Sequence, residues 1–216
     1  MSYFSRCQHR CFRFFMLTII GLFVVSLSIA LTPLAYGAVI SAGASSLSVS
    51  SLPVNVDAKK VQSTWLGWYN AVRLKAKLSP YVYNSTLSRT ATAWSTTAKE
   101  RGYLNHKRDG QTAYYDYTLI KKWFASQGVV FTGSGTLFTE NIGWGPYRCT
   151  KKDCTSEMID TIRYTFDAYM AEKGKSYRPH YNSIISSVYT KIGLGIVVDE
   201  KKGKLYLTVH FAKKVL

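Results

Sequence analysis

Two side chains in the last quarter of the sequence have types that could do chemistry. His180 lies in the stretch RPHYNSII, and Glu172 precedes it by eight residues. An imidazole can act as an acid, a base or a metal ligand near neutral pH, and a carboxylate can orient such a ring. A single histidine is more often a hydrogen-bonded structural residue than a ligand, so partners elsewhere in the chain must decide its role.

The segment that carries Glu172 gives the clearest helical pattern. At 100° per residue, one narrow face of residues 155–172 carries Met158, Ile162, Thr165 and Tyr169. The same face continues to Glu172 in the last turn, where the helix dipole disfavours a negative charge. Glu172 therefore either finds a partner inside the domain or bends out to water, and the pattern leaves both open.

Three further helices are predicted upstream. Aromatic residues at helical spacing predict a helix over residues 58–77, and its stripe is interpreted as core: Trp65, Trp68 and Tyr69. A second helix is predicted between a cap at Asn84 and a stop at Gly102, with His106 in the loop just beyond. Residues 114–124 predict a short helix.

The remaining segments are predicted to be extended. Residues 129–144 have a weak strand pattern, whereas residues 191–212 predict an antiparallel hairpin with its turn at 199–203. One face of the second hairpin strand is apolar: Leu205, Leu207, Val209 and Phe211. His210 lies on the more polar face of that strand, and we interpret it as structural.

The N-terminal part predicts export. Residues 1–37 carry three arginines and no acid, and the apolar run 14–34 is long enough to cross a bilayer. Ala35-Tyr36-Gly37 before Ala38 resembles a signal-peptidase site, so a cleaved signal peptide and a single membrane anchor both remain open. Residues 38–57 are a flexible Ser/Ala-rich linker, and residues 58–216 form one domain. The part after residue 38 is expected to be extracellular, either secreted or anchored.

The charge is strongly basic. The formal net charge is +16, and residues 38–216 carry 25 basic against 12 acidic residues. Outside a cell the matching partners are a membrane surface or an anionic cell-surface polymer, and the sequence contains no nucleic-acid module. Because the lysines are scattered, a soluble basic surface without a partner is an equal interpretation.

The four cysteines fall into two pairs. Cys149 and Cys154 enclose an exported loop, where oxidising conditions favour a disulfide. Closing so small a loop stabilises the fold by about 2 kcal/mol, so the bridge is expected to shape the loop more than to hold the domain together. Cys7 and Cys11 precede the apolar run and do not fit a lipoprotein signal; their role stays open.

Four fragments in order resemble the CAP superfamily, also called SCP domains, whose members include cysteine-rich secretory, antigen 5 and pathogenesis-related class 1 proteins as well as bacterial exported relatives. The fragments are His106 after the second helix, Glu140-Asn141-Ile142, Tyr169 with Glu172, and His180-Tyr181. The resemblance covers about residues 58–213 and implies an α+β fold, a three-layer α-β-α sandwich with a central antiparallel sheet. Thr139 and Pro179 depart from the glycines expected there.

The resemblance also implies a site. In the family two histidines and two glutamates converge in one cleft, and here they are His106, Glu140, Glu172 and His180. Some members bind zinc or another divalent metal through the histidines, so His106 and His180 are the expected metal ligands. Because structural zinc has four protein ligands and catalytic zinc three, two ligands predict a weakly bound ion.

Three functions follow in order of preference. The first is a binding module for lipid or another apolar or acidic ligand, because several family members carry sterols or fatty acids. The second is a structural or cell-surface interaction protein that makes no active use of the cleft. The third is a metal-dependent hydrolase with Glu140 or Glu172 as general base, which lacks a third metal ligand and a nucleophile. No residue is assigned a catalytic role.

Overall fold

The computed structural model describes residues 52–216, which fall within the second of two units of the chain, residues 41–216. Nine elements follow one another: α1 (Ala58–Lys75), β1 (Val82–Tyr83), α2 (Ser85–Arg101), α3 (Tyr117–Ser126), β2 (Phe138–Pro146), α4 (Thr155–Met170), α5 (Pro179–Ile184), β3 (Lys191–Asp199) and β4 (Lys204–Ala212). The expected signal or anchor, its cysteines Cys7 and Cys11, and most of the linker lie outside the described residues. No helix within residues 52–216 has the length and apolar character needed to cross a membrane.

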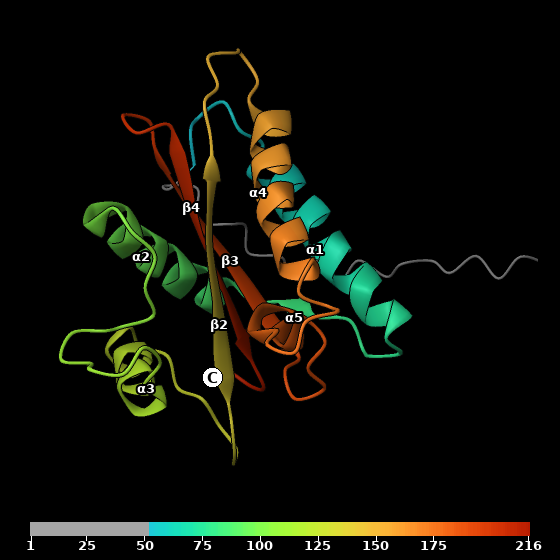
Figure 1. Ribbon diagram of the computed structural model, residues 1–216, viewed down its shortest axis with the longest axis vertical. Helices are drawn as coiled ribbons and strands as arrows, with labels where there is room; N and C mark the ends of the chain where they lie inside the picture. The colour runs from blue at the N-terminus through green and yellow to red at the C-terminus, as the bar shows by residue number, and fades with distance from the viewer. Residues whose placement is uncertain (1–51) are drawn as a thin grey trace, which may run out of the picture. The chain divides into compact units, whose positions relative to one another are not determined.

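The sheet has the order β1-β3-β4-β2 and separates two helical layers. Figure 1 shows α2 and α3 on one side of the strands and α1, α4 and α5 on the other. The predicted α-β-α sandwich is confirmed, and the three long strands are antiparallel as expected. The two-residue β1 is the exception, since it runs parallel to β3 at the sheet edge.

Side-chain caps fix where the helices begin. The carboxylate or amide oxygens of Asp57, Asn84 and Asp116 each accept a backbone N–H three residues on. The cap at Asp116 explains why α3 begins at Tyr117, three residues later than the pattern predicted. The helix α2 ends at Gly102, whose φ of 80° is left-handed, as predicted.

Both faces of the hairpin are buried. Its apolar face packs against α1 and α4, with Leu205, Leu207, Val209 and Phe211 at most 2% exposed. The face expected to be more polar is covered by α2, which leaves Thr208 and His210 as buried as the apolar residues. Apolar and polar residues alternate along the strand as predicted. Because a helical layer covers each face, however, the two faces do not differ in solvent exposure.

Two glycines allow α2 to lie directly on the sheet. A Cβ atom on Gly193 would lie 2.3 Å from the Ser88 nitrogen, and one on Gly195 would lie 2.0 Å from the Thr92 nitrogen. Real Cβ atoms do not come so close to backbone, so any side chain would push helix and strand apart. The Ser95 hydroxyl donates to the Gly195 carbonyl at 3.1 Å across the same contact.

The short helix α5, which the sequence pattern did not predict, is held in place by a buried arginine of α1. The Arg73 guanidinium donates to the carbonyls of Ile184 (3.1 Å) and Ser186 (2.8 Å). The Tyr81 hydroxyl donates to the Ser183 carbonyl at 2.7 Å. These bonds satisfy the last carbonyls of a helix too short to be stable alone, and so they position His180 at its start.

The predicted disulfide Cys149–Cys154 is present. Its loop also holds the segment before α1, because the Asn55 side chain donates to the Lys151 carbonyl at 2.9 Å and the Cys154 N–H donates to the Asn55 carbonyl at 2.9 Å. The bridge therefore shapes a junction between the loop and the start of the domain.

The glycine contact gives a testable expectation. Gly195→Ala should lower the free energy of unfolding by roughly 1–3 kcal/mol or more, because its Cβ would overlap the α2 backbone. Gly67→Ala is the matched control: Gly67 lies in α1 with nothing near its would-be Cβ, so alanine should raise stability by about 0.5–1 kcal/mol. Urea unfolding of both variants measures the difference, and equal effects would contradict the close contact.

Candidate functional site

The four predicted site residues line one cavity of about 380 Å³. Loop residues after α2, the first half of β2, and the segment from Glu172 through α5 build its walls. The complete lining is His106, Tyr114, Tyr115, Thr139, Glu140, Asn141, Glu172, Tyr177, Pro179, His180 and Ser183. Segments that are distant in the chain are thus brought together at one place on the sheet.

Glu140 is a fully buried carboxylate held by three other side chains. Arg108 donates to both of its oxygens, at 2.9 and 2.7 Å. His106 Nδ1 lies 2.8 Å from Oε1, and His210 Nε2 lies 2.7 Å from Oε2. Burial by itself would raise the pKa of Glu140, but the Arg108 charge and these hydrogen bonds hold it well below its usual range. The group is therefore ionised at neutral pH.

His210 has a structural role that depends on Glu140. The ring is completely buried, and burial lowers its pKa, so it is neutral near pH 7. Its Nε2–H donates to Glu140, and Nδ1 accepts from the Thr90 hydroxyl at 2.9 Å. Both nitrogens are thus used inside the domain, and His210 does not line the cavity.

Glu172 and His180 form a second pair on the other wall. The α4 helix ends at Met170, before the predicted end at 172, so Glu172 belongs to the turn that follows. Its Oε1 lies 2.6 Å from His180 Nδ1, and its Oε2 accepts the backbone N–H groups of His180 (2.9 Å) and Tyr181 (3.2 Å). Glu172 therefore points into the domain, which decides between the two orientations left open by the sequence.

Aromatic rings fix the orientation of both cavity histidines. His180 stacks on Tyr169, with ring centroids 4.7 Å apart and an interplanar angle of 15°. His106 meets Tyr114 and Tyr115 edge to face at 5.2 and 5.3 Å. Because each Nδ1 faces a carboxylate, each ring carries a proton there, and in the neutral form of the ring Nε2 keeps a lone pair. No hydrogen bond within residues 52–216 occupies either Nε2.

This donor set suits a metal only weakly. Two neutral imidazoles with carboxylates behind them are the pattern that orients metal ligands. Within the described part of the chain, however, no three His, Cys, Asp or Glu residues are grouped closely enough to hold an ion together. Both histidines line the same cavity, so an ion bound there would have at most these two side chains as imidazole ligands.

Arg108 and His210 complete the site but were not identified from sequence. Neither matches a motif, and Arg108 meets Glu140 across 32 residues of sequence. The sequence feature that could have indicated such partners is Glu140 itself, since a buried anion requires cationic or hydrogen-bonding partners. That rule predicts that partners exist, and the fold decides which residues they are.

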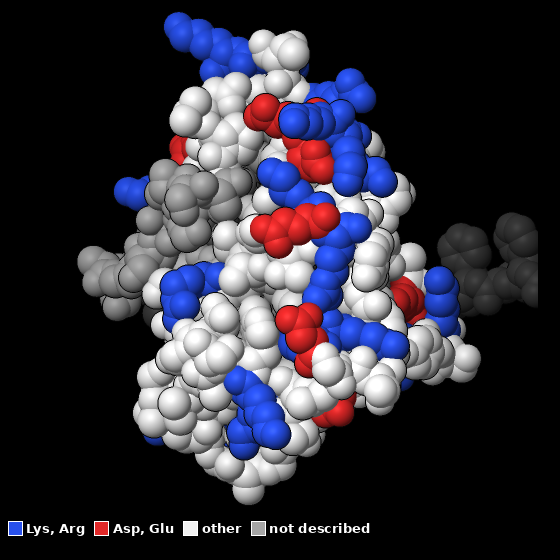
Figure 2. Space-filling view, turned by 90° about the vertical axis from the view of Figure 1, so that its left-hand side faces the viewer, with Lys and Arg blue, Asp and Glu red and all other residues white. Residues whose placement is uncertain are grey.

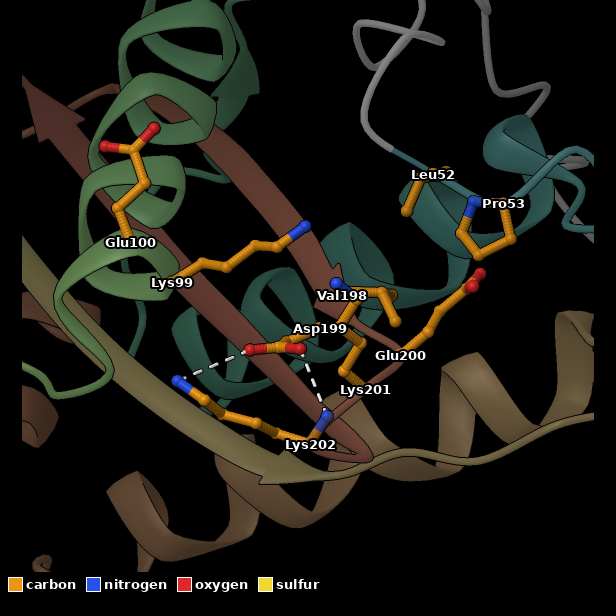
Figure 3. Close-up of a pocket in the computed structure, with 9 residues that line it drawn as sticks. All are labelled: Leu52, Pro53, Lys99, Glu100, Val198, Asp199, Glu200, Lys201 and Lys202. Atoms are coloured by element: carbon orange, nitrogen blue, oxygen red, sulfur yellow. Dashed lines mark hydrogen bonds and ion pairs between the residues drawn. The ribbon is translucent and has the colours of Figure 1, made fainter.

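A larger cavity, about 590 Å³, lies elsewhere, at the turn between β3 and β4. Its charges are balanced, with three lysines and three acids among its nine residues, and Figure 3 shows Asp199 paired with Lys202. It contains no histidine and shares no residue with the cavity of the four predicted side chains. We therefore place the candidate site at the smaller cavity.

The buried ion pair generates a prediction. Arg108→Met should cost roughly 3–5 kcal/mol of stability at pH 7, because Glu140 would stay buried without its cation. Without Arg108, burial raises the pKa of Glu140 above its value of about 4.3 in the unfolded chain. The ionised carboxylate then destabilises the folded variant more as pH rises, so the loss of stability should be smaller at pH 5 than at pH 7.

Urea unfolding at both pH values measures this deficit. The double variant Arg108→Met with Glu140→Gln should recover part of the loss. Arg163→Gln, which removes an exposed ion pair with Asp167, should change stability by less than about 1 kcal/mol. A deficit for Arg108→Met that is independent of pH would contradict the argument.

Comparison with known proteins bears on the fold and the family of the chain. No curated protein matches the sequence. Solved structures that resemble the fold include an outer surface protein from Borrelia burgdorferi, with a TM-score of 0.50 and 17% identity over 74% of this chain and 96% of that one. The CAP domain of Enterococcal PrgA has a TM-score of 0.49 and 18% identity over 77% and 65%. An extracellular SCP-domain protein from Bacillus anthracis has a TM-score of 0.48 and 16% identity, over 72% of this chain and 41% of that one.

The sequence itself matches a family model over most of its length. Residues 66–211 match the model of the cysteine-rich secretory protein family, CAP, and this range contains all four cavity residues and both of the partners that complete the site. The match covers more than half of the 216 residues. The chain therefore belongs to the cysteine-rich secretory protein (CAP) family.

Proposed function

We propose that this CAP protein is an extracellular binding module for a small amphiphile with an acidic head group, such as a fatty acid. The supporting observation is the cavity itself: about 380 Å³ of space, walled by tyrosines and a proline, with two imidazole nitrogens that have no partner within residues 52–216. This volume falls in the range of roughly 300–1,000 Å³ typical of ligand pockets. A neutral imidazole accepts a hydrogen bond at Nε2, so a protonated head group or a bound cation would supply the missing partner of that nitrogen.

A weakly bound divalent metal such as zinc fits the same site. His106 and His180 would hold it through Nε2, while Glu140 and Glu172 keep the two rings oriented through Nδ1. When bound, the ion would supply a positive charge to which a carboxylate head group can coordinate. The chain's own residues then orient the two rings and surround the apolar part of the ligand with tyrosines.

The hydrogen bonds that the two glutamates already accept favour a binding function over hydrolysis. Glu140 accepts from Arg108, His106 and His210, and its oxygens are inaccessible to solvent. Glu172 is bound by an imidazole and two backbone amides. A general base needs a free lone pair within reach of the proton it removes; Glu140 accepts four hydrogen bonds and has none left, and Glu172 accepts three.

The net positive charge of the surface suits acidic partners, but the basic residues are not gathered into one patch. Figure 2 shows Lys and Arg interspersed with Asp and Glu over the α2–α3 face. Interspersed charge is typical of a soluble surface. We therefore base the proposed function on the cavity. Anionic polymers or membrane surfaces would be attracted only by the long-range effect of the net positive charge.

The metal proposal predicts a selective loss. His180→Ala should weaken zinc binding by at least tenfold in calorimetric titration of residues 38–216, because one of two imidazole ligands is removed. Ser183→Ala is the control, since its hydroxyl lines the same cavity but donates to the Pro179 carbonyl. Equal zinc affinity in the wild type and the His180 variant would refute the assignment.

The lipid proposal is tested with two matched tyrosines. Residues 38–216 should bind a fatty acid saturably at micromolar concentration, about −8 kcal/mol. Tyr114→Ala should weaken this binding because Tyr114 lines the cavity, whereas Tyr103→Ala should not, although the two residues are similarly exposed at 59% and 56%. No saturable binding of fatty acids or sterols would favour the structural or cell-surface interaction role instead.

A further inference from the structure

The outer strand of the sheet has one edge without a partner among the described residues. β2 stands at the end of the strand order and pairs along its nine residues with β4 alone. In Figure 1 it lies in front of the other strands, with α2 and α3 to one side and α4 and α5 to the other. Edge strands present unpaired backbone groups to which another strand can bind.

The hydrogen-bond register shows which groups face outward. The Tyr147 N–H donates to the Gly203 carbonyl at 2.9 Å, and the Lys213 N–H donates to the Leu137 carbonyl at 2.8 Å. In an antiparallel pair only alternate residues direct N–H and C=O toward the partner, so the odd-numbered residues of β2 bond to β4. The N–H and C=O groups that face outward in the middle of β2 are therefore those of Glu140, Ile142 and Trp144.

These groups lie along a groove. The 380 Å³ cavity is lined by residues 139–141 of β2, and a second cavity of about 290 Å³ is lined by residues 142–144. The two cavities share Glu172 and His180, so they adjoin one another along the strand. Leu104 forms part of the wall on the side of α2, and α4 forms the opposite wall.

Part of this edge is protected, because Glu140 is an inward-pointing charge and Glu140 and Ile142 are only 4% and 7% exposed, but the end that carries Trp144 is open. The sequence of β2, FTENIGWGP, contains no lysine or arginine, and its only proline is the last residue. Trp144 and Tyr164 in the second cavity are 48% and 63% exposed. The hydroxyl of Tyr169, which also lines that cavity, is buried and has no hydrogen-bond partner within residues 52–216. Backbone groups with aromatic walls are the components of strand-addition sites.

Charge identifies the occupant. Lys204 lies over the Trp144 ring at 4.8 Å at one end, and the exposed turn that carries Lys173, Lys175 and Arg178 lies at the other, next to the lining residue Tyr177. Of the two glutamates of the groove, Glu140 is neutralised by Arg108, and Glu172 accepts hydrogen bonds from His180. We propose that the free edge of β2 binds an extended acidic polypeptide segment as an additional strand. This ligand class goes beyond the small amphiphile proposed above.

The first test uses a defined peptide and the full chain in non-ionic detergent. The probe is an acetylated, amidated nine-residue peptide in which glutamate and valine alternate, carrying a fluorophore for anisotropy. It should bind saturably, and affinity should fall as salt rises. Two control peptides should each bind at least tenfold more weakly: one N-methylated at every second residue, which cannot pair, and one with lysine in place of glutamate.

Hydrogen exchange resolved to single residues locates the contact in the wild-type chain. On adding the peptide, exchange should slow at least tenfold at the outward amides of Glu140, Ile142 and Trp144. The amides of Asn141 and Gly143, which already bond to β4, should not change. This alternation is specific to strand addition, and protection of neither set or of both sets equally would overturn the proposal.

Two substitutions at one position separate the backbone from the side chain. Trp144→Ala removes the ring but keeps the outward N–H, whereas Trp144→Pro removes both, and proline is tolerated where an edge N–H faces outward. Affinity for the peptide should fall several-fold for alanine and at least tenfold further for proline. If the proline variant does not fold, the exchange pattern of the wild type still decides.

Three results would overturn the inference. Equal binding of the N-methylated peptide would mean that side chains alone make the contact. Equal affinity of Trp144→Pro and Trp144→Ala in folded protein would exclude pairing at that residue. Slow exchange of the three outward amides in the free chain would mean that residues 38–51 or a second copy already cover the edge.

Discussion

The buried carboxylate of Glu140 is the constraint on which the site depends. An anion without solvent must be paired, and here one guanidinium and two imidazoles satisfy it completely. These bonds join β2, β4 and the loop after α2, so the same interaction that compensates the charge also fixes the wall of the cavity. It sets the tautomer of His106 as well, because Nδ1 must carry the proton that Glu140 accepts.

Close packing supplies the rigidity that this arrangement requires. The glycines of β3 let the backbone of α2 touch the sheet, and the glycines of β2 leave room for the threonines of α4. Arg73 and Tyr81 hold α5 by its carbonyls, which keeps His180 stacked on Tyr169. The two histidines are therefore carried by elements from opposite sides of the sheet, each oriented by a glutamate.

The cavity and the strand edge adjoin one another, and the two proposals assign them different ligands. Imidazole nitrogens and tyrosines suit a small amphiphile, whereas outward backbone groups beside Trp144 suit an extended chain. Both use binding groups that are already oriented in the free protein, which lowers the ordering cost of association. Each of the two carboxylates orients one cavity imidazole through its Nδ1.

The sequence by itself determined the helices, the hairpin, the disulfide and the family, because periodicity, caps and motif order are local properties. It also identified four residues that come to share one cavity. Only the tertiary structure decided that Arg108 and His210 complete the Glu140 cluster, that the polar face of the hairpin is buried, and that α5 forms. It likewise decided that β2 is an edge strand with three outward backbone groups. These features depend on which segments meet across the sheet, and such contacts between residues distant in the chain leave no periodic signal in either partner.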